Sequence, residues 1–150
     1  MAPRSTKVLP TLAFVGAGGD VAFWVSYWTG LISFGDDPSI ASFEAAFPVA
    51  DALLGAALVG AGIGGLRGKR YGSFFLAVAG AMALYLGVLD VTFYVRRGGY
   101  FGIGTDAFTE LLINIVCLAG GVAALAGAWR QWMRTDCAAT EGPIACAQGP

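Results

Sequence analysis

The sequence contains no histidine, and charged residues make up only 13% of its 150 positions. Histidine is the commonest ligand for zinc and similar metals and the usual general base near neutral pH. Any proton chemistry must therefore use Asp, Glu, Tyr, Lys or Cys. The three cysteines form no CxxC pair and have no spacing typical of a metal site. We therefore expect no metal site and no cofactor.

The sequence also lacks a charge imbalance, because its formal net charge is −1 and no basic stripe is present. This excludes nucleic acid as an expected partner. Hydrophobic residues instead account for 57% of the chain, and the mean hydropathy is +0.69. A soluble domain carries about twice this share of charged residues. The composition therefore predicts a membrane protein, with membrane lipid as its surroundings.

Four stretches are long and apolar enough for a helix that crosses the hydrocarbon core, which needs about 20 residues. They cover about residues 8–33, 45–66, 71–95 and 105–132. The links between them are short and contain Gly, Pro, Asp and Ser, which favour turns and make neighbouring helices antiparallel. We predict an all-α polytopic membrane protein, an up-down bundle of four transmembrane helices within residues 1–134. Residues 135–150 are expected to form a disordered cytoplasmic tail.

The distribution of Lys and Arg predicts the orientation of the bundle, because cytoplasmic segments carry an excess of these residues. One side of the predicted membrane holds Arg4, Lys7, Arg67, Lys69, Arg70, Arg130 and Arg134. The other side holds only Arg96 and Arg97. We therefore predict a multi-pass protein of the cell membrane with both termini in the cytoplasm.

Each predicted span carries one acidic residue at membrane depth. These residues are Asp20, Asp51, Asp90 and Glu110. At a rise of about 1.5 Å per residue, the last three and Asn114 fall in one layer near the outer side, with Asp20 deeper. A carboxylate far from water is costly, so we expect Asp20 to be a neutral acid at pH 7.

The acids also share helical faces with aromatic residues. Asp20, Trp24, Tyr27 and Trp28 form one stripe, and Asp90, Tyr94 and Arg97 form another. On the second span Phe47, Asp51 and Gly55 share a face, with Glu44 one step above. Ionisable groups inside a membrane normally face the bundle interior or a cavity. The pattern therefore predicts a pocket of carboxyl and aromatic groups that opens outward.

From this pattern we predict candidate site residues in two roles. The expected catalytic residues are Asp20, Asp90 and Glu110. The expected substrate-binding residues are Trp24, Tyr27, Trp28, Asp51, Tyr94, Asn114 and Arg97. Structural alternatives stay open for some of them: Asp51 near a helix start complements the helix dipole, Trp28 is a typical interfacial anchor, and Asn114 can link two helices. The acids can also form a hydrogen-bond network without any ligand.

Three short motifs resemble those of a small family of bacterial four-span integral membrane proteins. The first consists of Asp20, Phe23, Tyr27 and Trp28, and the others are FPVAD at 47–51 and LGVLDVTFY at 86–94. The resemblance covers roughly residues 15–130. The resemblance implies a four-helix fold and a location in the membrane, and it implies no activity.

The function we predict is cofactor-free acid–base chemistry inside the membrane, an isomerisation or cyclisation of a lipophilic, isoprenoid-like or polyketide-like substrate. Asp20 would donate the proton and Asp90 or Glu110 would accept it. One alternative is a proton-coupled small-molecule transporter that acts as a dimer; another is a non-catalytic lipid-binding or assembly subunit. Glycine-rich faces such as Gly60 and Gly64 suit close helix packing, either within one chain or in a homodimer.

Overall fold

The computed structural model describes residues 7–32, 38–98 and 105–140. These residues form five helices and no strand. The helices are α1 (Val8–Trp28), α2 (Pro38–Glu44), α3 (Phe47–Leu66), α4 (Arg70–Arg97) and α5 (Thr105–Thr140). Four helical segments are long and apolar enough to cross a membrane: Val8–Trp28, Pro38–Leu66, Arg70–Arg97 and Phe108–Met133. The predicted all-α bundle of four transmembrane helices is confirmed.

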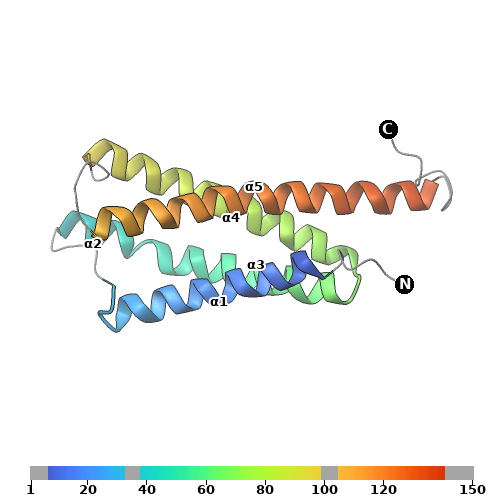
Figure 1. Ribbon diagram of the computed structural model, residues 1–150, viewed down its shortest axis with the longest axis horizontal. Helices are drawn as coiled ribbons and strands as arrows, with labels where there is room; N and C mark the ends of the chain where they lie inside the picture. Colours follow the sequence, from blue (N-terminus) through green and yellow to red (C-terminus); the bar gives the residue numbers. More distant parts are fainter. Residues whose placement is uncertain (1–6, 33–37, 99–104, 141–150) are drawn as a thin grey trace.

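The four long helices lie along the long axis of the molecule, and each packs on the next (Figure 1). α1 packs on α3, α3 on α4, and α4 on α5, while the short α2 sits at the end of the bundle where α3 begins. The core between them consists of small and aliphatic side chains. One cluster contains Ala13, Ala61, Leu76 and Ala128, and a second contains Leu54, Ala57, Ala79 and Leu86. Small side chains let the helix backbones approach closely.

The structure corrects the prediction at the first link. Residues 34–44 were expected to be a link, but residues 38–44 form α2, and only the two residues 45–46 separate it from α3. Pro38 suits the first position of a helix, where no backbone N–H donor is needed. The candidate membrane span therefore begins at Pro38 and includes Glu44, which we had placed outside the membrane.

The last helix also differs from the expected span in its length. α5 is helical through Thr140, although the fourth span was predicted to end near residue 132. The apolar part that suits a membrane ends at Met133. Residues 141–150, which belong to the predicted tail, lie outside the described residues.

Glycine allows α3 and α4 to touch next to the turn that joins them. A Cβ atom placed on Gly64 would lie 2.5 Å from both Cα and N of Gly72. Gly60, one turn earlier, faces the ring of Phe75 on α4. The Gly60 and Gly64 face is therefore used for packing within the bundle. The homodimer stays a prediction.

Candidate functional site

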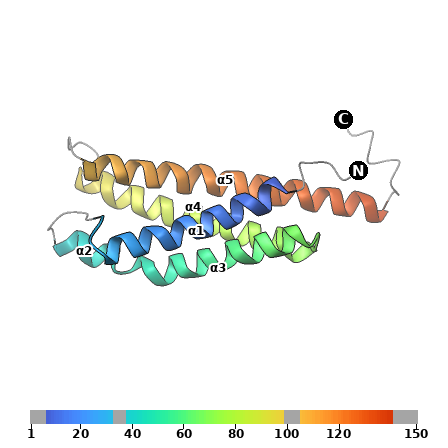
Figure 2. The ribbon, with the colours of Figure 1, turned by 60° about the horizontal axis from the view of Figure 1, so that its bottom comes forward.

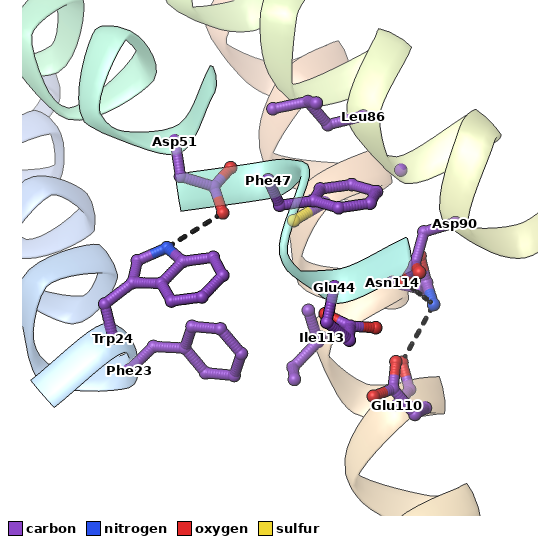
Figure 3. Close-up of a pocket in the computed structure, with 12 residues that line it drawn as sticks. Phe23, Trp24, Glu44, Phe47, Asp51, Leu86, Asp90, Glu110, Ile113 and Asn114 are labelled. Carbon is purple, nitrogen blue, oxygen red and sulfur yellow. Dashed lines mark hydrogen bonds between the residues drawn. The ribbon is translucent and has the colours of Figure 1, made fainter. Parts of the chain in front are cut away.

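A small cavity lies at the end of the bundle where α1 and α4 end and where α3 and α5 begin (Figure 3). It has a volume of about 50 Å³, which is room for a few water molecules. Its walls are Phe23, Trp24, Glu44, Phe47, Asp51, Leu86, Gly87, Asp90, Glu110, Ile113, Asn114 and Cys117. All five helices contribute to these walls, so only the assembled bundle forms this cavity.

Four of the lining residues are acids. Glu44 comes from α2, Asp51 from α3, Asp90 from α4 and Glu110 from α5. The side chains of Glu44, Asp90 and Glu110 are only 6%, 8% and 3% exposed, so they are shielded by other helices as well as by any surrounding lipid. None of the described residues that line the cavity is Lys or Arg. The wall therefore gathers acidic groups without a basic side chain among them.

Neutral donors hold the carboxyl groups in place. The Trp24 indole Nε1 donates to Asp51 Oδ2 at 3.0 Å, which ties α1 to α3. The Tyr94 hydroxyl donates to Glu44 Oε1 at 3.2 Å, which ties α4 to α2. Hydrogen bonds from neutral groups orient a carboxylate but leave its charge uncompensated.

Asn114 makes the central polar contact between α4 and α5. Its Nδ2 donates to Asp90 Oδ2 at 2.7 Å and to the backbone oxygen of Glu110 at 3.0 Å (Figure 3). The side chain is only 2% exposed. Asp90 and Tyr94 lie one turn apart on α4, and Glu110 and Asn114 lie one turn apart on α5, so each helix brings two polar groups to the same face.

The aromatic part of the predicted site is only partly on the cavity wall. Trp24 is buried and lines the cavity, while Tyr27 packs edge-on against it with ring centroids 5.5 Å apart. Trp28 lies 5.8 Å from Trp24, but 68% of its surface is exposed. The position of Trp28 agrees better with an interfacial anchor than with a cavity wall.

Asp20 and Arg97, which we also predicted as site residues, are not among the residues that line the cavity. Asp20 is half-buried and faces α3, with its Oδ2 atom 2.7 Å from the place where a Cβ on Gly55 would lie. The Arg97 guanidinium lies over the ring of Phe93, 5.4 Å from its centroid. Phe43 of α2 stacks on the ring of Phe93, with ring centroids 3.8 Å apart. Arg97 thus contacts the aromatic stack that joins α2 to α4.

Several lining residues were absent from the predicted site, above all Glu44. Glu44, Phe47 and Asp51 are spaced i, i+3 and i+7, so the signal of a shared face was present. Glu44 was placed one step above this face and outside the span, because Pro38 and the neighbouring polar residues favour a link over a helix. Phe23, Ile113 and Cys117 are neutral side chains, and the packing of α1 on α3 and of α5 on α4 places them on the cavity wall.

Three of the acids can act together on one small cation or one proton. Glu44, Asp90 and Glu110 each offer a carboxylate oxygen, and these three oxygens lie within 4.8 Å of one another. Hard cations prefer oxygen ligands of this kind. Carboxyl groups this close also share protons, because two negative charges at short range repel each other.

The Trp24–Asp51 contact leads to a first prediction. We expect Trp24→Phe to lower the free energy of unfolding by about 1–3 kcal/mol, because a partly buried carboxyl group loses its donor while the aromatic ring stays. Equilibrium unfolding in mixed micelles measures this difference. Trp28→Phe is the matched control, because Trp28 is exposed and is expected to change stability by less than about 0.5 kcal/mol. Equal losses in both variants would contradict a role for this hydrogen bond.

Comparisons with protein-family models, with curated proteins and with solved structures found no match to this chain. The resemblance to a family of four-span proteins therefore stays a prediction. The chain forms a bundle of four membrane-spanning helices, and its acid-lined cavity is the feature that bears on its function.

Proposed function

We propose that this protein exchanges protons for a small organic cation at the cavity, as a proton-coupled transporter in the cell membrane. One observation supports the proposal above the others: four carboxyl groups line a small cavity, and no Lys or Arg is among the described lining residues. Charge inside a membrane must be balanced, since an isolated carboxylate there is costly. Protons and cations are the two ways to balance it.

Competition for the same carboxyl groups links the two kinds of ligand. A bound cation favours ionised carboxylates and so displaces protons, while protonation weakens the site for the cation. The aromatic rings of Phe23, Trp24 and Phe47 lie on the same wall. Aromatic faces attract cations, and quaternary ammonium groups are typical ligands of such surroundings. The chemistry of the wall therefore suits an ammonium group better than an anion or a sugar.

The size of the cavity favours transport of a small charged group over chemistry on a large substrate. Pockets that enclose a drug-sized ligand have volumes of roughly 300–1,000 Å³, whereas this cavity has about 50 Å³. An ammonium head can be bound there, but a polycyclic or isoprenoid substrate would need a wider pocket.

Acid–base isomerase or cyclase chemistry on a lipophilic substrate remains a second candidate. It is favoured by the carboxyl oxygens of Glu44, Asp90 and Glu110 within 4.8 Å of one another and by their different donors, Tyr94 and Asn114. Carboxyl groups in different surroundings suit separate acid and base roles. The test compares lipid-extract metabolites of the producing cell with and without Glu110→Gln. Unchanged profiles would rule against this candidate.

The proposed orientation places both termini in the cytoplasm and the cavity toward the outer side of the membrane. The support is the excess of Lys and Arg at the N-terminus, in the turn between α3 and α4 and near the end of α5. Protons that the cation displaces would then leave on the outer side.

The proposal predicts proton release on binding. Tetramethylammonium is a suitable probe because it carries no titratable proton of its own. We expect its addition to purified protein in a weakly buffered detergent solution to acidify the solution, with up to one proton per bound cation. If one proton is displaced, the affinity should fall about tenfold for each unit of decreasing pH. Binding without proton release, or no binding at any pH, would contradict the proposal.

A measurement of proton flux across a membrane then tests whether the protein transports the cation. Protein vesicles that enclose a pH-sensitive dye should change their internal pH when a tetramethylammonium gradient is applied, and protein-free vesicles should not. Binding with proton release but without flux would identify a cation-binding protein that does not transport.

A further inference from the structure

The helices α1 and α5 approach each other at one end of the bundle only. Near the start of α1, a Cβ atom on Gly127 would lie 3.1 Å from Leu9 Cδ1, and Ala13 and Ala128 belong to one core cluster. Toward Trp28 the two helices diverge, and both views of the ribbon show this (Figures 1 and 2). The end where they diverge is the end that holds the cavity.

Both of these helices nevertheless supply cavity wall. α1 contributes Phe23 and Trp24, and α5 contributes Ile113 and Cys117 besides its polar residues. Polar contacts join α1 to α3 through Trp24 and α4 to α5 through Asn114. The part of the wall that Phe23 and Ile113 supply is apolar, and it lies where α1 and α5 diverge.

Open glycines extend this wall along both helices. A Cβ atom on Gly19 or Gly120 would meet no atom within 4 Å outside its own helical surroundings, and both residues are exposed. Gly19 is one turn before Phe23, and Gly120 is seven residues after Ile113, so each continues the face that lines the cavity. We call Gly19, Phe23, Ile113 and Gly120 the α1–α5 seam.

The surroundings of the seam are apolar. Val116, beside it on α5, is 62% exposed, and Val21 on α1 is also 62% exposed. In a bilayer such surfaces face lipid tails. The seam therefore lies between an acidic cavity on its inner side and an apolar medium on its outer side.

We infer that the cavity is open sideways to the lipid through the α1–α5 seam and takes an amphiphilic alkylammonium cation, with its head at the carboxyl groups and its alkyl tail in the seam. The inference rests on the proposed function, and it names the substrate class. Charge complementarity selects the head, since the acids need a cation. The apolar seam selects the tail, and it explains how a small cavity can serve a molecule larger than itself.

The test compares two cations that share one head group. Octyltrimethylammonium and tetramethylammonium are added to protein in lipid nanodiscs, and proton release reports binding of each. The wild-type protein should bind the octyl compound about tenfold or more tightly, because its tail is buried. Gly19→Leu, Gly120→Leu and the double variant should remove this preference, since leucine side chains fill the seam. Binding of tetramethylammonium should change by less than about twofold, which also shows that the variants are folded.

Gly18→Leu is the matched control. Gly18 is exposed, a Cβ there would also meet no atom within 4 Å, and it precedes Gly19 by one position, so it points to a different side of α1. We expect this variant to keep the wild-type preference for the octyl compound. It controls for the effects of leucine on helix formation and on hydrophobicity.

The outcomes separate this inference from the proposed function. If neither cation releases protons, the proposed function fails. If tetramethylammonium releases protons but the octyl compound binds no better, or if the seam variants keep the preference, only the sideways opening is overturned. A second copy of the chain is the other occupant to consider. If the seam variants convert a dimer into a monomer, the seam is an interface between copies and the inference is wrong.

Discussion

Gly72→Leu is expected to destabilise the bundle by about 3 kcal/mol or more, because overpacking of a backbone contact cannot be relieved by a side-chain shift. A Cβ atom on Gly72 would lie 2.5 Å from the backbone N of Gly65 and 2.6 Å from the carbonyl carbon of Gly64. These atoms belong to α3 just before its turn into α4, so relief requires that the two helices separate. Thermal or denaturant unfolding of the protein in micelles measures the loss.

The control for this prediction is again a glycine to leucine change in a transmembrane helix. Gly18→Leu adds the same side chain where a Cβ meets nothing within 4 Å. We expect it to change the free energy of unfolding by less than about 0.5 kcal/mol. If Gly72→Leu unfolds like Gly18→Leu, α3 and α4 do not cross in backbone contact at these glycines.

Asp90→Asn is expected to weaken cation binding by about 10- to 100-fold, which corresponds to the roughly 1.5–3 kcal/mol of a charged hydrogen-bonded contact. Asp90 lies on the cavity wall and accepts the hydrogen bond from Asn114 at 2.7 Å. Asparagine has nearly the same shape and can still accept this bond. The variant therefore removes a titratable charge while it preserves the link between α4 and α5. Proton release per added tetramethylammonium measures the effect.

Thr92→Val is the control on the same helix. Thr92 is exposed, and its hydroxyl donates to the backbone oxygen of Val88 rather than to any cavity residue. We expect its cation affinity and proton release to equal those of the wild type. Unchanged binding in Asp90→Asn would show that the central carboxyl group takes no part, and the proposed exchange would then be wrong.

Much of the fold could be predicted from the sequence, because each spanning helix is a local property of about 20 apolar residues. Five of the lining residues could also be predicted from the sequence, because they are polar or amphipathic groups in apolar helices. They are Trp24, Asp51, Asp90, Glu110 and Asn114. The first link was misread because Pro38 is compatible with both a turn and a helix start. Asp20 showed the same pattern as the other acids, yet its side chain faces Gly55 of α3.

The amino-acid pattern alone indicates the membrane environment, the number of spans and the end of the bundle where most of the acids gather. Hydropathy and helical periodicity carry this information, and neither requires knowledge of which helices are neighbours. Which acids share one cavity, the place of Glu44 among them and the divergence of α1 and α5 beside it become visible only once the helices are packed. Those features depend on helix crossing, and crossing is set by contacts between residues far apart in the chain, such as Gly64 with Gly72 and Leu9 with Gly127.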